Sequence, residues 1–206
     1  MINVCVQCGA YHADKLIDPA GPFAICPDCG ALHPFQQQPL LVVSGASGSG
    51  KSSLCRLLTG QVRQAVLLDA DILWRPEFNQ PENDYRDFYE TWLRLCKNIG
   101  QSGRPVVLFN AGAGVASNLE NCIERRYFSR IHTLALVCAD EILAARLSSR
   151  PAWRAAPDPD SIEAQLSFNR WFKETAAVEC LDTGTLTEKE TAALVETWIL
   201  TKLKEK

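Results

Sequence analysis

Eight consecutive residues, from Gly45 to Ser52, fit the pattern GxxxxGK[ST] of a phosphate-binding loop. The apolar run 40–43 predicts a buried strand before the loop, and residues 53–58 predict the opening of a helix after it. Glycines let successive backbone N–H groups surround phosphate oxygens, and the N-terminus of the helix adds a partial positive charge. A glycine-rich turn formed by chance would not need the flanking strand and helix. The motif therefore predicts binding of a nucleoside triphosphate.

The side chains of this loop have separate expected roles. Lys51 is expected to reach the β- and γ-phosphates of ATP, and the Ser52 hydroxyl is expected to hold Mg²⁺. The residues expected to bind the nucleotide are Gly45, Ser47, Gly48, Ser49, Gly50, Lys51, Ser52 and Ser53.

Two carboxylates, Asp69 and Asp71, stand at the end of the next apolar run, residues 65–69. In a parallel sheet, ligands gather at the carboxyl ends of strands, which would bring both carboxylates beside the γ-phosphate. Phosphoryl transfer to an alcohol needs one carboxylate near Mg²⁺ and a second that faces the acceptor hydroxyl. We expect Asp69 to serve the metal and Asp71 the acceptor, so both are candidate catalytic residues with Lys51. An Asx turn that ends the strand is the structural alternative.

Three arginines, Arg146, Arg150 and Arg154, recur at four-residue spacing. On a continuous helix this spacing would form a solvated basic stripe. Pro151 and Trp153 instead favour a mobile flap that brings the guanidinium groups onto the transferring phosphoryl group. Arginine suits that role because it stays charged and binds phosphate oxygens in a fork. The three arginines are therefore further candidate catalytic residues.

Four of the nine cysteines form two CxxCG knuckles: Cys5 with Cys8, and Cys26 with Cys29. With 17 residues between the knuckles, the spacing is typical of a four-thiolate zinc site. Such a closed site is structural because it leaves no open position for a substrate. A segment as short as 1–36 cannot fold on hydrophobic burial alone, so zinc must supply much of its stability. A redox pair is the alternative, and the partner of this zinc ribbon stays open among proteins, nucleic acid and a neighbouring domain.

The composition sets outer limits on function. With 206 residues, of which 47% are hydrophobic, the chain can bury one full core and a small appendage. Its net charge of −3 provides no global basic field for long nucleic acids. No apolar run approaches the roughly 20 residues that span a bilayer, and the N-terminus does not resemble a signal peptide. The five cysteines outside the knuckles are scattered among apolar residues, which favours a reducing, cytoplasmic location. Without a spanning run, we expect no membrane contact.

Short apolar runs alternate with helical patterns from residue 39 onward. After the first two predicted strands, further strands are expected at 106–109, 133–138 and 178–181. Helices are expected at 84–99, 117–126, 140–149 and 161–177, the first with Phe88, Trp92, Leu95 and Ile99 on one face. Asp140 is a candidate N-cap, and Thr187 with Glu190 forms a capping box for a C-terminal helix. This alternation predicts an α/β fold with a parallel sheet covered on both faces.

Three features together resemble the nucleoside monophosphate kinase-like group of P-loop kinases, which includes shikimate, gluconate, adenylylsulfate and nucleoside kinases. They are the loop at 45–52, the Asp-x-Asp after the second strand, and the arginine series. The guanine-reading sequence NKxD of GTPases is absent, as is an apolar run ending in Asp-Glu of the kind that many motor ATPases have. The resemblance covers about 39–206 and implies five parallel strands in the order 2-3-1-4-5, with a lid near 146–159. The zinc ribbon at 1–36 is a departure from the small-molecule members.

The resemblance also implies where substrates bind. Residues 110–114 occupy the place of the glycine-rich substrate loop of shikimate-type kinases, but Asn-Ala-Gly-Ala-Gly argues against shikimate itself. Residues 182–185 occupy the place of the adenine-contacting loop. The residues expected to contact the acceptor are Asp71, Trp74, Arg75, Asn110 and Gly112.

The sequence therefore predicts an enzyme that moves the γ-phosphate of ATP to a small-molecule acceptor, a nucleoside or nucleotide. A polynucleotide 5′-hydroxyl kinase, with the ribbon holding the strand, is one alternative. A regulatory ATPase whose ribbon recruits a partner is another. The expected cofactors are ATP, Mg²⁺ and Zn²⁺, and the oligomeric state is open.

Overall fold

A computed structural model describes residues 2–149 and 159–205. Its larger sheet has five parallel strands in the spatial order β5-β6-β4-β7-β8. Numbered along the chain within this sheet, the order is 2-3-1-4-5, as predicted. The strands are β4 (Leu40–Ser44), β5 (Val66–Asp69), β6 (Val106–Phe109), β7 (Ile131–Val137) and β8 (Glu179–Asp182).

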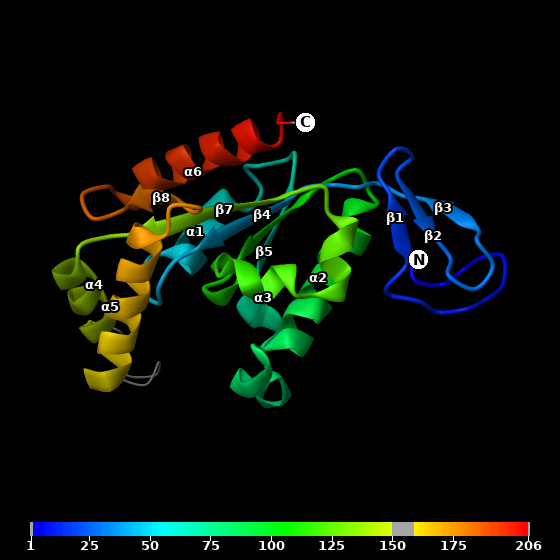
Figure 1. The fold of residues 1–206 in the computed structure, drawn as a ribbon. Coiled ribbons are helices and arrows are strands. Elements are labelled where there is room, and N and C mark those ends of the chain that lie inside the picture. The colour runs from blue at the N-terminus through cyan, green and yellow to red at the C-terminus, as the bar shows by residue number, and fades with distance from the viewer. Residues whose placement is uncertain (1, 150–158, 206) are drawn as a thin grey trace.

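Helices cover both faces of this sheet (Figure 1). They are α1 (Lys51–Leu58), α2 (Arg86–Gly100), α3 (Ala116–Glu120), α4 (Asp140–Ser148), α5 (Pro159–Glu174) and α6 (Glu188–Lys202). Along β4, Leu40 and Val42 pack with α2 and α3, whereas Leu41 and Val43 pack with α1 and α6. Because successive side chains of a strand point to opposite faces, a central strand covered twice must be apolar throughout.

Short 3₁₀ helices lie in the connections between these strands and helices. They are η1 (Ala70–Leu73), η2 (Pro76–Phe78), η3 (Pro81–Asn83), η4 (Gly112–Gly114) and η5 (Ile123–Tyr127). The helix expected over 117–126 is therefore wrong as a single element, because α3 ends at Glu120 and η5 follows. Glu90 of α2 explains the break, since its carboxylate accepts from the backbone N–H groups of Ile123 at 2.5 Å and Glu124 at 3.1 Å.

Two further local expectations need correction. Asp140 is the first residue of α4 rather than its cap, and its carboxylate instead accepts from Arg170 Nε at 2.5 Å. Helix α2 begins only at Arg86, and Leu95, expected on its buried face, is 36% exposed. The capping box of Thr187 and Glu190 is confirmed.

The N-terminal segment forms a separate antiparallel sheet in the order β1-β2-β3, at the end of the molecule opposite α4 and α5 (Figure 1). Its strands are β1 (Leu16–Asp18), β2 (Phe23–Ile25) and β3 (Leu32–Pro34). This segment, which we call the ribbon, packs against α2 and η5. Phe35 meets the Tyr127 ring edge-on at 5.8 Å between centroids, and the Tyr127 hydroxyl donates to Ala13 O at 2.9 Å.

A buried polar cluster joins the ribbon to α2 and η5. Glu124 is fully buried and accepts from Lys97 of α2, from Arg94 Nε at 2.8 Å and from Asn3 Nδ2 at 3.2 Å. Lys97 also donates to Asn3 Oδ1, so the Asn3 side chain of the ribbon hydrogen-bonds to both Lys97 and Glu124. Burial is the main cause that lowers the pKa of Lys97, and Glu124 opposes it. No helix in the described ranges is long and apolar enough to cross a membrane.

Candidate active site and metal centre

The backbone between β4 and α1 has the shape that a phosphate requires. Gly45, Gly48 and Gly50 have φ values of 133°, 87° and 105°, which are costly for residues with a Cβ. A Cβ at Gly45 would lie 2.4 Å from the carbonyl oxygen of Leu136 in β7. Because α1 starts at Lys51, directly after the loop, its N-terminal N–H groups and their partial positive charge face the same space.

Polar groups of the loop are arranged around this space. Lys51 Nζ donates to Gly45 O at 2.8 Å and to Ala46 O at 3.0 Å, which holds the ammonium group over the loop. The Ser49 hydroxyl is buried and has no hydrogen-bond partner among the described residues. An orphaned buried hydroxyl and a left-handed glycine backbone both fit an anion that completes the loop.

A cavity of about 450 Å³ places the loop opposite the acidic pair. We call it the transfer cavity. It is lined by Ser47, Gly48, Gly50, Lys51, Ser52, Ser53 and Asp71. The cavity thus brings the ammonium group of Lys51, the hydroxyl of Ser52 and the exposed carboxylate of Asp71 into one space, although Asp71 lies outside the loop in sequence.

Asp69 occupies a different position from Asp71. Its Oδ1 accepts from the Asp71 N–H at 3.1 Å and so caps η1, which is the Asx-type arrangement foreseen as the alternative. Its charge also reaches Cys55 of α1, since burial and then Asp69 raise the pKa of that thiol to about 11. Ser52 and Cys55 are three residues apart on one helix and are therefore neighbours on its surface. Asp69 thus faces the part of α1 that carries Ser52.

A second cavity, of about 310 Å³, adjoins the other side of the loop. We call it the nucleoside cavity. It is lined by Gly48, Ser49, Gly50, Ser53, Leu54, Arg146, Thr183, Leu186, Glu188 and Thr191. Arg146 donates to Thr183 Oγ1 at 3.1 Å and to Thr183 O at 2.9 Å, so its guanidinium is held here. Arg150 and Arg154 lie outside the described residues, so the placement of the three arginines over the transferring group stays a prediction.

The turn after β6 uses its polar groups to stabilise itself. Asn110 Oδ1 accepts from the Ala113 N–H at 2.9 Å, and Gly112 O accepts from Asn118 Nδ2 at 2.9 Å. A Cβ at Gly112 would lie 2.0 Å from the hydroxyl oxygen of Tyr89 in α2. Burial raises the pKa of Tyr89 to about 12, so the phenol stays protonated. Asn110 therefore stabilises the turn from within, whereas Gly112 is held by Tyr89 of α2 and Asn118 of α3.

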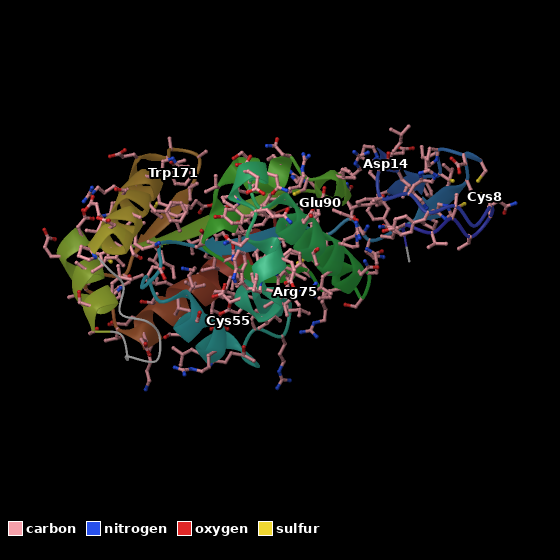
Figure 2. The ribbon with its side chains drawn as sticks, turned by 90° about the horizontal axis from the view of Figure 1, so that it is seen from below. Cys8, Asp14, Cys55, Arg75, Glu90 and Trp171 are labelled. Carbon is pink, nitrogen blue, oxygen red and sulfur yellow. The ribbon has the colours of Figure 1, made fainter. Side chains whose placement is uncertain are left out.

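Trp74 and Arg75, the other expected acceptor contacts, follow the acidic pair on the surface. Trp74 is 47% exposed and meets the Phe88 ring edge-on at 5.3 Å between centroids. The guanidinium carbon of Arg75 lies 5.0 Å from the ring centroid of Phe78. Figure 2 shows Arg75 in the middle of the molecule, between Cys8 at one end and Trp171 at the other. Trp74 thus packs on Phe88 of α2 and Arg75 on Phe78 of η2, and these two rings meet edge-on at 5.5 Å between centroids in one aromatic cluster.

Comparison with solved structures agrees with this geometry. A sugar kinase from Janibacter sp. HTCC2649 matches with a TM-score of 0.60 at 15% identity, over 81% of this chain and 96% of that one. A gluconokinase from Sinorhizobium meliloti 1021 matches with a TM-score of 0.53 at 20% identity, over 82% and 95%. Thymidylate kinase from Candida albicans matches with a TM-score of 0.53 at 14% identity, over 81% and 92%. The chain has the P-loop kinase fold. No protein-family model and no curated protein sequence matches it.

Within this kinase fold, one contact at the loop was missed in the sequence. Gln165 of α5 accepts a hydrogen bond from the Ser47 N–H at 2.7 Å. A glutamine in an amphipathic helix has no distinguishing local pattern, so only the packing of α5 against the loop reveals it. Tyr89 and Asn118 were likewise indistinguishable from ordinary helix residues in the sequence.

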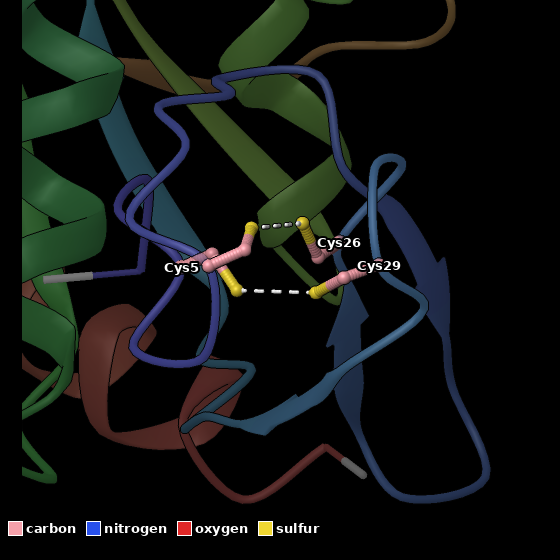
Figure 3. A group of neighbouring side chains, drawn as sticks. Cys5, Cys26 and Cys29 are labelled. Atoms are coloured by element: carbon pink, nitrogen blue, oxygen red, sulfur yellow. Dashed lines mark hydrogen bonds between the residues drawn. The ribbon is translucent and has the colours of Figure 1, made fainter.

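The four cysteines of the two knuckles form the candidate metal centre of the ribbon (Figure 3). Their sulfur atoms all lie within 4.8 Å of one another, with Cys5 and Cys29 at 3.6 Å and Cys8 and Cys26 at 3.8 Å. Four sulfurs about 2.3 Å from a tetrahedral Zn²⁺ would be about 3.8 Å apart. The donor set therefore fits zinc. His12 is not a member of this group, and its Nε2 lies 3.1 Å from Asp28 Oδ1.

Proposed function

We propose that the chain is an ATP-dependent phosphotransferase that moves the γ-phosphate to a hydroxyl or phosphate of a small molecule, a nucleoside or nucleotide. The transfer cavity is the observation that carries this proposal, because it combines Lys51 and Ser52 with the exposed carboxylate of Asp71. A loop and helix N-terminus alone would support nucleotide binding. The carboxylate across the cavity adds a group that can orient or deprotonate an acceptor.

The residues divide the reaction between them. The N–H groups of the loop and the ammonium of Lys51 bind the phosphates and stabilise the charge that develops on the migrating group. Asp71 accepts the proton of the acceptor hydroxyl or holds that hydroxyl in line. Ser52 and Asp69 would hold Mg²⁺, which when bound neutralises charge on the phosphate oxygens.

The nucleoside cavity supports ATP as the donor. Arg146 is fixed on Thr183 beside the loop, and Leu54 and Leu186 provide apolar wall. A planar guanidinium next to apolar side chains suits a nucleobase, because arginine stacks on aromatic faces. We propose that the chain from Arg146 to residue 159 acts as the lid, with Arg150 and Arg154 contributing charge.

Trp74, Arg75, Asn110 and Gly112 remain our proposed acceptor contacts. The aromatic cluster beneath Trp74 suits a flat ring, which favours a nucleoside or nucleotide. The structural neighbours include a sugar kinase, a gluconokinase and a thymidylate kinase, so sugars and sugar acids belong in the same test.

The ribbon does not support a polynucleotide acceptor. Two of its three acidic residues, Asp14 and Asp28, have side chains 62% and 54% exposed. Lys15 is the one lysine or arginine in residues 1–36, and it is fully buried. A nucleic-acid surface would instead present several cations to the phosphates. We propose that the ribbon, residues 1–36, is a structural attachment of the kinase fold at 39–206.

A product assay tests the proposed function. The protein is incubated with Mg·ATP and a panel of nucleosides, nucleotides, sugars, sugar acids and oligonucleotides, while ADP release and the phosphorylated product are measured. We expect one class of small molecule to raise ADP release and to be recovered with an added phosphate. Lys51→Ala should abolish that signal, and Lys173→Ala, on the exposed surface of α5, should leave it unchanged. ADP release that no acceptor stimulates would favour the regulatory ATPase.

A further inference from the structure

Helix α5 contributes a polar side chain to the phosphate-binding loop. The backbone N–H of Ser47 donates to Gln165 Oε1 at 2.7 Å, and Ser47 lines the transfer cavity. Because a backbone N–H can only donate, the atom of the Gln165 amide that faces it must be the oxygen. The NH₂ group on the same carbon is then the part of the side chain that can donate to a ligand.

A buried asparagine one turn later fixes α5 at this position. Asn169 is fully buried, its Oδ1 accepts from Cys138 N at 3.3 Å, and its Nδ2 donates to Cys138 O at 2.9 Å. Cys138 directly follows β7, which pairs with β4 at the start of the loop. Residues four apart lie on the same face of a helix. Asn169 therefore anchors α5 to the sheet, and this anchor holds Gln165 over the loop.

Apolar packing supports the same contact. Ile162 and Leu166, on either side of Gln165, pack into a cluster with Ala46 of the loop and with Leu143 of α4. A Cβ at Gly48 would lie 3.2 Å from Leu147 of α4, so the loop itself is in close contact with this layer. The hydrogen bond of Gln165 is thus made between packed elements.

We propose that Gln165 is a phosphate-binding residue, whose oxygen holds the Ser47 N–H and whose NH₂ group donates to a terminal phosphate oxygen of ATP. This inference rests on the proposed function, because it requires ATP in the transfer cavity. An amide can accept from the loop and donate to the ligand at once, without adding charge. A hydrogen bond to an ionised group contributes more than one between neutral groups, so its loss should be measurable in nucleotide affinity.

Two substitutions separate donation to the nucleotide from support of the loop. Gln165→Glu keeps an oxygen for the Ser47 N–H but loses the donor and adds a negative charge, whereas Gln165→Leu loses both functions. The affinities of the wild-type protein and both variants are measured by titration with Mg·ADP and with a non-hydrolysable Mg·ATP analogue. For Gln165→Glu we expect the analogue to bind about 10- to 100-fold more weakly, as loss of a hydrogen bond to a charged group implies, and ADP to change far less. Gln165→Leu should also weaken binding of the analogue more than binding of ADP, but by a smaller factor than Gln165→Glu.

Glu163→Gln provides the matched control on the same helix. Glu163 is exposed and pairs with Arg170 at 3.0 Å, away from the loop, so its substitution should leave both affinities unchanged. Wild-type affinity of Gln165→Glu for the analogue would overturn the proposal, because an oxygen that only supports the loop is retained in glutamate. Equal losses for ADP and the analogue would overturn it too, since the contact would not involve the terminal phosphate. Should the Glu variant fail to fold, as judged by thermal unfolding, the Leu variant decides by the same comparison. If the wild-type protein binds neither nucleotide, the proposed function itself fails.

Discussion

The residues of the transfer cavity have chemical roles that single substitutions can separate. Lys51, Ser52 and Asp71 line one space, while Asp69 is not among its lining residues and caps η1. Lys51 binds the phosphates throughout the reaction, whereas Asp71 acts on the acceptor. Removing either group should therefore change the kinetics in a different way.

Replacing Lys51 by alanine should reduce turnover by at least about 100-fold, since it removes a preorganised positive charge from the migrating phosphoryl group. The fold should survive, because the hydrogen bonds of Lys51 to Gly45 O and Ala46 O are local to the loop. Steady-state kinetics and circular dichroism check the two statements. A wild-type rate in this variant would contradict the assignment of the phosphate-binding loop.

Asp71→Asn should lower kcat and kcat/KM for the acceptor together, by roughly 10²- to 10⁴-fold, because a general base acts in the transition state. Its effect on Mg·ATP affinity should be small. Asp69→Asn should weaken Mg·ATP binding as well, because Asp69 faces the part of α1 that carries Ser52. Kinetics with the acceptor found in the panel and nucleotide titration measure both. Full kcat in Asp71→Asn would remove the central residue of the mechanism and favour the regulatory ATPase.

At the scale of elements, helices α2 and α3 hold the turn that follows β6. The Tyr89 hydroxyl fills the space that a Cβ at Gly112 would need, and Asn118 donates to the Gly112 carbonyl. The glycine is therefore required by the approach of a side chain from α2. Its φ is not among the positive values, so the constraint is steric rather than conformational.

Gly112→Ala should destabilise the protein by about 1–3 kcal/mol, which is typical of overpacking. Tyr89→Phe removes the hydroxyl oxygen that would lie 2.0 Å from the new methyl group, and the next ring atom lies 3.3 Å away. The double variant should therefore be more stable than the sum of the single effects predicts, with a coupling of roughly 0.5–3 kcal/mol. Chemical denaturation of the four proteins measures this. Additive effects would show that Tyr89 does not constrain the turn.

Gly100→Ala is the matched control for this cycle. A Cβ there would make only ordinary contacts, at 3.4 Å or more, with the side chain of Gln38. Because Gly100 is the last residue of α2 and alanine is the better helix former, the change should be neutral or stabilising by up to about 1 kcal/mol.

At the scale of the molecule, the ribbon and the kinase fold share a buried interface. Glu124 and Lys97 belong to the kinase fold, but Asn3 of the ribbon completes their hydrogen bonds. Unfolding the ribbon would expose this pair and uncover Tyr127. The two parts should therefore unfold as one unit.

Lys97→Met should destabilise the whole protein by about 3–5 kcal/mol, because it leaves Glu124 buried with one charged partner fewer. Lys202→Met provides a comparison, since Lys202 pairs with the half-exposed Glu179 and Glu205. Such pairs contribute about 1 kcal/mol or less. Denaturant unfolding of both variants checks the difference, and equal effects would contradict a structural role for the buried cluster.

The protein should contain close to one zinc per chain, and its removal should lower the thermal stability of the kinase fold together with that of the ribbon. Four thiolates complete the tetrahedron, and the free energy of binding zinc contributes to folding. Metal analysis of protein purified without added zinc tests the first statement. Scanning calorimetry with and without a chelator tests the second. Intramolecular disulfides in place of zinc would contradict the first statement. A main unfolding transition that the chelator leaves unchanged would contradict the second.

Local chemistry and periodicity in the sequence were sufficient for the framework. The glycines and Lys51 identified the loop, the four cysteines the candidate zinc site, and the alternation of apolar runs a sheet covered on both faces. The strand order 2-3-1-4-5 followed from the resemblance to P-loop kinases and is confirmed. The loop, the cysteine knuckles and the apolar runs depend on residues close together in the chain, whose constraints are visible in their types and spacing.

Contacts between distant segments were decided only by the tertiary structure. Glu90 ends the helix predicted over 117–126, Tyr89 fixes the turn at Gly112, and Gln165 reaches the loop at Ser47. The position of the ribbon against α2 likewise depends on the buried carboxylate of Glu124, which accepts a hydrogen bond from Asn3. The sequence around Glu124 does not predict this contact. Each of these side chains is an ordinary helix residue by local pattern. The role of each side chain arises from the group that the fold places opposite it. A hydrogen bond or a steric contact needs two groups close together in space, and the amino-acid sequence alone does not give the distance between groups far apart in the chain.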